Sequence, residues 1–146
     1  MIAASPQLSK LAQLWERAEK ALGRWPGIEE IGAGDLALAY PGYFIVGRLK
    51  DAPETAYVYL ETGPDLPRQL GQSVKGKRFD EVLVAPALAS IQEAYKSTLA
   101  RGAPHIWECT NLVNNERMRR YRRLALPITD TRGDGRCILA VAEWLS

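Results

Sequence analysis

The sequence predicts an α+β fold in which five antiparallel strands form one sheet, with helices on one face and a flanking helix at the N-terminus. Three observations predict it. An amphipathic stripe with helical spacing lies near the start, two strand-like runs precede residue 63, and three longer runs follow residue 103. A helical block separates the two groups of strands. The length of 146 residues fits one domain.

The first element is a helix over residues 6–23. Ser5 and Pro6 form a helix start, with a capping side chain before a proline in the first turn, and Gly23 is a suitable terminator. Apolar residues recur at steps of three and four and give the helix one apolar stripe. The stripe consists of Leu8, Leu11, Ala12, Trp15, Ala18 and Leu22. Residues 24–35 are rich in turn formers and are expected to be a connection, so we divide the chain into residues 1–35 and a domain of residues 36–146.

Two strands follow, at Tyr43–Lys50 and Ala56–Thr62, with a turn at residues 51–54. The short connection predicts that they pair as a hairpin. The next block is helical, with short pieces at Pro64–Leu70 and Phe79–Val84 and a long helix at Ala85–Arg101 that ends at a glycine.

Three strands close the chain. They are predicted at Pro104–Val113, Met118–Ile128 and Arg136–Leu145. The connections between them contain Asn, Asp and Gly, which accept the left-handed backbone of tight reversals. Neighbouring strands joined by short loops are therefore expected to be antiparallel.

Two segments carry a recognisable pattern. After the second strand, Gly63 is followed by a Leu70-Gly71 pair, by Gly76, and by the residues FDE at 79–81. The segment 120–130 contains the run YRRLALPI. These segments resemble two parts of the PAS domain, as found in compact single-domain bacterial PAS proteins: the stretch after the second strand, and the fourth strand, which often reads Y-x-R-x-x-x-P-I/L. The resemblance covers residues 36–146 and implies strand order 2-1-5-4-3 and a role in sensing, signal transduction or protein interaction. It implies no particular ligand.

A group of arginines surrounds Tyr121 in the fourth strand. Because side chains alternate between faces, Arg120 and Arg122 are expected to share a face with Leu124. If that face meets the helices, Arg122 is placed to hold a carboxylate or phosphate. Otherwise the arginines form a solvated strand end. The expected ligand-binding residues are Ile45, Tyr59, Tyr95, Arg120, Arg122 and Leu124, with a small anion as the possible ligand.

An alternative hypothesis assigns a different function to the same arginine cluster. In it the chain is a small nucleotide- or anion-binding α+β protein, or an enzyme, built around Arg117–Arg123. Nucleic acid is an unfavoured partner, because the formal net charge is only +2.

Tryptophans are expected to join the flanking helix to the sheet. Trp107 and Trp144 are predicted on the outer sheet face, under the N-terminal helix or in a homodimer seam. This set of interface residues is Leu8, Leu11, Trp15, Ala18, Leu22, Trp107 and Trp144. We expect a homodimer.

Catalytic and metal chemistry find little support. The chain has one histidine, His105, and two cysteines, too few for a four-ligand zinc site or a disulfide framework. The run from Gly71 to Lys77 resembles a phosphate-binding loop, but Arg78 stands where Ser or Thr is needed. We therefore expect no catalytic residue, no metal and no cofactor. The N-terminus has no long apolar run, so we expect neither signal peptide nor membrane span, and a cytoplasmic location.

Overall fold

The computed structural model describes residues 5–48, 57–83, 85–113, 117–130 and 135–145, with the backbone alone for 85–87, 109–113 and 117–119. Five strands form one antiparallel sheet in the order β2-β1-β5-β4-β3. The strands are β1 (Tyr43–Arg48), β2 (Tyr57–Thr62), β3 (His105–Val113), β4 (Arg117–Thr129) and β5 (Arg136–Trp144). The predicted fold class and strand order are confirmed.

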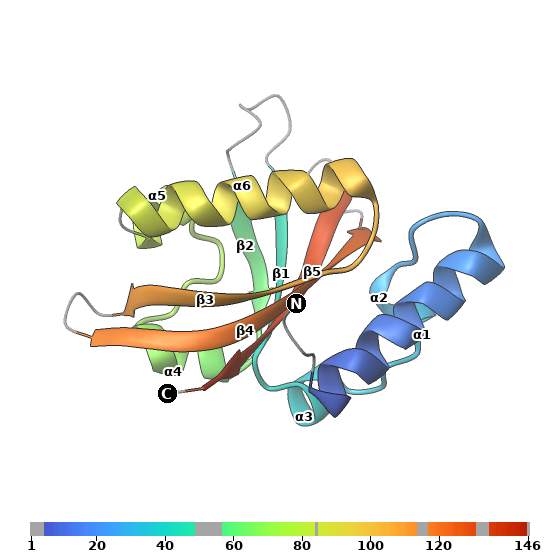
Figure 1. Cartoon of the computed structure of the whole chain (residues 1–146), viewed down its shortest axis with the longest axis horizontal. Helices are drawn as coiled ribbons and strands as arrows, with labels where there is room; N and C mark the ends of the chain where they lie inside the picture. Colours follow the sequence, from blue (N-terminus) through green and yellow to red (C-terminus); the bar gives the residue numbers. More distant parts are fainter. Residues whose placement is uncertain (1–4, 49–56, 84, 114–116, 131–134, 146) are drawn as a thin grey trace.

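Helices cover both faces of the sheet (Figure 1). The long helix α6 (Ala85–Arg101) lies across what we call the inner face, together with α4 (Asp65–Leu70) and α5 (Phe79–Val82). The N-terminal helix α1 (Pro6–Leu22) packs on the opposite, outer face with α2 (Ile28–Ile31) and α3 (Leu36–Ala39). The proposed boundary at residue 35 stays a prediction.

The ends of α1 follow the sequence signals. The Leu8 amide donates to the Ser5 hydroxyl oxygen at 3.1 Å, and Gly23 closes the helix with φ +70°. By contrast, α2 lies inside the segment expected to be a connection. It has four residues, as α3 does, and a single turn is too short to produce a periodic apolar pattern.

The sheet separates two apolar cores. Strands with one buried face alternate polar and apolar residues, but here both faces are buried and the central strands are apolar almost throughout. The inner core contains Phe44, Val46, Tyr57, Tyr59, Leu66, Val74, Phe79, Ile91, Tyr95, Leu99, Tyr121, Ala125, Ile138, Ala140 and Ala142. The outer core contains Leu8, Leu11, Trp15, Ile31, Leu36, Tyr40, Tyr43, Ile45, Leu124, Leu126, Ile128, Cys137, Leu139 and Val141.

Candidate functional site

A buried arginine lies in the inner core. Arg123, in β4, is 4% exposed. Cross-strand pairing sets it opposite Trp107 of β3 and Ala142 of β5, and residues directly opposite in a sheet share a face. A charged group seldom leaves water unless its new surroundings stabilise it. The contacts of Arg123 therefore define the first candidate site.

Phenol hydroxyls and aromatic rings surround the Arg123 guanidinium. Its Nη1 donates to the Tyr95 hydroxyl at 2.8 Å, and its Nη2 donates to the Tyr121 hydroxyl at 3.1 Å. The guanidinium carbon lies 5.0 Å from the ring centroids of Phe44 and Tyr121, 5.6 Å from Tyr95 and 5.9 Å from Trp107. These distances suit cation–π attraction. We call these five residues the Arg123 cage.

The cage continues into a larger aromatic cluster under α5 and α6. Tyr95 meets the rings of Tyr57 and Phe79 at 6.0 and 5.6 Å, and Phe79 lies 4.6 Å from Tyr59. Burial raises the pKa of Tyr59 above its ordinary value, and the positive charge of Arg123 opposes that rise. Tyr59 is therefore a neutral hydroxyl, able to donate or accept a hydrogen bond.

Only part of the predicted ligand site lies on this face. Tyr59 and Tyr95 belong to the inner core, as expected. Ile45 and Leu124 belong to the outer core, so their predicted face is wrong. Arg122 neighbours Arg123 along the strand and has the opposite orientation, which corrects the expectation that Arg120 and Arg122 face the helices. The buried cation is Arg123.

The arginines of β4 do not converge on one point. Arg120 forms an exposed ion pair with Glu108, with Nη2 2.7 Å from Oε1. Arg122 is half-buried, and its Nε has no hydrogen-bond partner among the described residues. The side chains of Arg117 and Arg119 lie outside the described residues. A single anion site formed by the whole cluster is therefore not what this geometry favours.

Some of the predicted interface residues of α1 are buried and others are exposed. Leu8, Leu11 and Trp15 are at most 2% exposed and pack on the outer face, whereas Ala18 is half-buried and Leu22 is 41% exposed. Leu8, Leu11 and Trp15 of the α1 stripe are thus buried within their own chain, whereas Leu22 is not.

Trp107 and Trp144 pack against the inner core and not beneath α1, which corrects their expected position. Trp144 lies beside Tyr121, with ring centroids 4.7 Å apart, and its buried indole nitrogen has no hydrogen-bond partner among the residues that the structure describes. The inner face therefore carries a further hydrogen-bond donor.

The single histidine, a buried cysteine and the lysine of the loop-like run make contacts within the fold. His105 is the first residue of β3, and its ring centroid lies 4.6 Å from that of Trp107. Desolvation lowers the pKa of His105, and the positive charge of Arg101 lowers it further. The Cys137 thiol is buried in the outer core. Lys77 follows a turn between α4 and α5 and donates to Gln72, an arrangement unlike a phosphate-binding loop.

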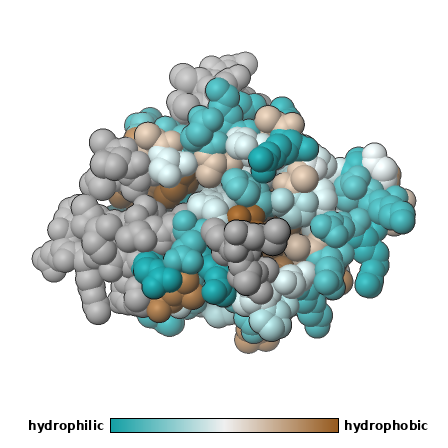
Figure 2. Space-filling model, in the orientation of Figure 1, coloured by the Kyte–Doolittle hydropathy of each residue, from teal (hydrophilic) through white to brown (hydrophobic). Residues whose placement is uncertain are grey.

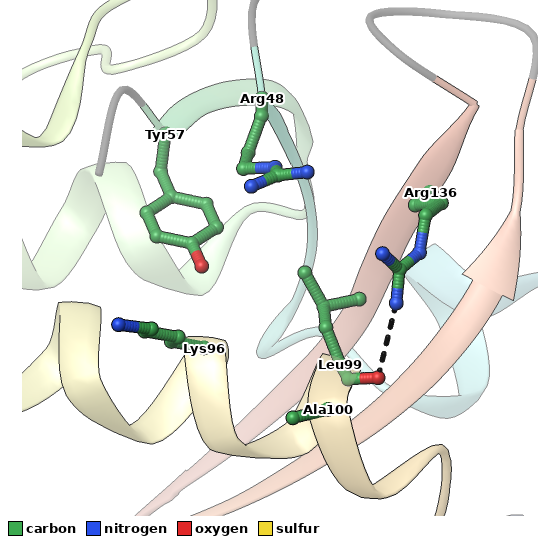
Figure 3. Close-up of a pocket in the computed structure, with 6 residues that line it drawn as sticks. All are labelled: Arg48, Tyr57, Lys96, Leu99, Ala100 and Arg136. Carbon is green, nitrogen blue, oxygen red and sulfur yellow. Dashed lines mark hydrogen bonds between the residues drawn. The ribbon is translucent and has the colours of Figure 1, made fainter. Parts of the chain in front are cut away.

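A second candidate site is a pocket of about 150 Å³ between α6 and the ends of three strands (Figure 3). Its described lining residues are Arg48, Tyr57, Lys96, Leu99, Ala100 and Arg136. Elsewhere, the described residues contain no group of three His, Cys, Asp or Glu side chains arranged to hold a metal ion. Within the described part of the chain, no helix has the length and apolar character needed to cross a bilayer.

No protein-family model and no curated protein matches this sequence. Solved structures do. A domain of an HTR-like protein from Haloarcula marismortui is 19% identical with a TM-score of 0.55, and the match covers 72% of this chain and 99% of that one. The Cycle PAS-B domain of Drosophila melanogaster is 11% identical with a TM-score of 0.50, and the match covers 70% and 99%.

A LOV protein from Rhodobacter sphaeroides is 13% identical with a TM-score of 0.53, over 97% of this chain and 69% of that one. The last likeness extends over nearly the whole chain and so includes α1. At these identities, what is shared is the fold.

Proposed function

We propose that this chain, which has the PAS fold, is a non-catalytic sensory domain for signal transduction that acts through protein–protein contacts and a small ligand on its inner face. The observation that carries the proposal is the Arg123 cage, a buried cation under α6. A cytoplasmic location and a homodimeric state belong to the same proposal.

The chemistry of the inner face supports a ligand with acceptor oxygens, such as a carboxylate. Arg123 has only donors, and the buried indole nitrogen of Trp144 adds another. Arginine binds carboxylates through two parallel hydrogen bonds, which are stronger than bonds to neutral hydroxyls. We therefore place the ligand-binding residues at Tyr59, Tyr95 and Arg123, and no longer at Ile45, Arg120, Arg122 or Leu124.

The same contacts supply a route for a signal. Tyr95 belongs to α6 and Tyr121 to β4, and both hydroxyls accept from the one guanidinium. An anion that drew this guanidinium away would break the bonds that join the helix to the sheet at this point. The position of α6 relative to β4 would then report whether ligand is bound.

Native mass spectrometry of freshly purified protein tests the ligand. We expect a co-purified small molecule in the parent protein and its loss in Arg123→Met, while Arg123→Lys retains part of it. Arg123→Met is expected to fold, because replacing a buried charge by an apolar side chain of similar length is often neutral or stabilising. A parent protein without bound small molecule, before and after incubation with a panel of carboxylates, would refute ligand sensing by the cage.

Because Leu8, Leu11 and Trp15 are buried, the proposed homodimer needs other side chains for its contact. A groove beside α1, about 290 Å³ in volume, is lined by Leu8, Ser9, Ala12, Gln13, Glu16, Pro104, Ile106 and Leu124. Of the apolar lining residues, Ala12, Pro104 and Ile106 are partly exposed, and a second copy of the chain would cover them. Figure 2 shows that hydrophobic residues on the face it presents form separate small patches among hydrophilic ones.

Light scattering tests this dimer. Ala12→Glu places a charge in the groove and is expected to convert a dimeric parent to monomer. Gln7→Glu adds the same charge to an exposed position of α1 that does not line the groove, and is expected to leave the dimer intact. A monomeric parent protein, or two variants with the same mass as a dimeric parent, would reject the interface.

A further inference from the structure

Three basic side chains line the pocket shown in Figure 3, which we call the basic pocket. Arg48 comes from the end of β1, Arg136 from the start of β5 and Lys96 from α6. Figure 3 shows the two guanidinium groups and the Tyr57 hydroxyl around one space above the Leu99 side chain, while the Lys96 ammonium group points away from the guanidinium groups. The described lining residues include no acidic side chain.

Sheet register explains why these groups meet. Arg48 pairs with Tyr57 across β1 and β2, and the neighbouring pair Gly47–Cys137 joins β1 to β5 next to Arg136. Arg136 is further oriented by α6, since its Nη2 donates to the Leu99 carbonyl oxygen at 3.2 Å. The pocket is therefore built on strand ends and a helix, elements that hold side chains more firmly than loops do.

We infer that the basic pocket binds a phosphoryl group, at a site separate from the Arg123 cage. A phosphate anion in the pocket would be attracted by the positive charges of its lining residues. Arginine presents a planar fork of donors that matches phosphate oxygens, while lysine adds a mobile point charge.

The volume restricts what enters. Pockets for drug-sized ligands span roughly 300–1,000 Å³, and the basic pocket measures about 150 Å³. It therefore holds one phosphoryl group, with any larger organic part remaining outside. Two sources share this chemistry, inorganic phosphate and the phosphate monoester of a small metabolite. Nucleic acid is a poorer fit, because its binding depends on many phosphate contacts along an extended surface.

Arg136 also has a structural role, and that role is an alternative explanation for its position in the basic pocket. Arg136 also stacks on Trp25, with its guanidinium carbon 5.2 Å from the ring centroid, and it satisfies a carbonyl near the C-terminal end of α6. Both contacts stabilise the fold without any ligand. A valid test must therefore separate phosphate affinity from stability.

We propose to titrate the full chain with inorganic phosphate and with glycerol phosphate, at fixed pH and ionic strength, by NMR of backbone amides. The parent protein is expected to show saturable shifts around Arg48, Ala100 and Arg136. Arg48→Gln is expected to weaken binding by about tenfold, as the loss of one charge-assisted contact predicts. Arg48→Gln combined with Arg136→Gln is expected to remove saturation.

The matched control is Arg68→Gln. Arg68 lies in α4 with 72% of its side chain exposed, so this change removes the same charge outside the pocket and is expected to leave phosphate affinity unchanged. Tighter binding of glycerol phosphate would identify a monoester as the ligand, and equal binding would identify free phosphate.

Three outcomes would overturn the inference. They are no saturable shift in the parent, an equal loss of affinity in Arg68→Gln, or variants that lose thermal stability but keep phosphate affinity. Because the Arg123 cage is not altered in these variants, failure here is distinct from failure of the proposed ligand on the inner face.

Discussion

Trp15 donates its indole N–H to the carbonyl oxygen of Pro127 across 2.6 Å, and this buried hydrogen bond joins α1 to β4. The two residues lie 112 positions apart in the sequence. The flanking helix is thus fixed to the sheet by a directed contact as well as by apolar packing.

Trp15→Phe is expected to lower the free energy of unfolding by about 1–3 kcal/mol, because it leaves the buried Pro127 carbonyl without its donor. Urea denaturation followed by circular dichroism measures the change. The control is Trp25→Phe, which makes the same chemical change at a half-buried ring whose described contacts use its face. A loss equal to or smaller than that of the control would show that the hydrogen bond adds nothing measurable.

Protonation of His105 is expected to destabilise the protein. Desolvation and the Arg101 charge lower its pKa in the folded state below 6.5, so the unfolded chain binds the proton more readily. The free energy of unfolding should therefore fall as the pH drops from 6.5 through the lowered pKa. Above pH 6.5, His105 should make no pH-dependent contribution to it. Melting temperatures of the parent and His105→Gln across pH 5–8 measure it; parallel curves would contradict the prediction.

Gly42 is expected to tolerate no side chain. A Cβ there would overlap the carbonyl oxygen of Ala142, whose amide donates to the Gly42 carbonyl at 3.0 Å. Gly42→Ala should cost about 1–3 kcal/mol through backbone displacement. Gly27→Ala serves as the control, because its Cβ would make only tight but ordinary contacts at 3.4 Å. Similar melting temperatures for the two variants would count against this close approach.

Arg120 and Arg122 are expected to be dispensable for binding nucleotides. The pair of Arg120 with Glu108 is exposed and should contribute no more than about 1 kcal/mol to stability. Calorimetric titration with nucleotides compares the binding heat of the parent with that of the Arg120→Ala, Arg122→Ala double variant. The two proteins are expected to give the same heat. Heat from the parent that disappears in the variant would revive a nucleotide-binding function for β4.

The order of elements was predictable because each carries its own local signal. The stripe of α1 repeats over about four turns, from Leu8 to Leu22, and the helix ends at the expected Gly23. Four-residue helices lack such repetition, so neither α2 nor α3 was predicted, whereas α5 lies within the predicted piece Phe79–Val84. Whether α1 covers the sheet or a second chain was not predictable from the stripe alone, since either arrangement buries it.

The candidate sites were less predictable, for a geometric reason. In β4 the residues from Arg123 to Ile128 are all buried, so no polar position marks which face is which. An error of one residue then exchanges Arg122 with Arg123, and the same error displaced Trp107 and Trp144. The basic pocket was missed because Arg48, Lys96 and Arg136 are far apart in sequence and meet only through the sheet order.

The position of β4 between two cores has one more consequence. Arg123 and Ala125 face α6 while Leu124 and Leu126 face the α1 side, so one strand is a wall of both compartments. A slight twist or slide of this strand alters the packing under both helices simultaneously. Along β4, a single layer of backbone therefore separates the two cores.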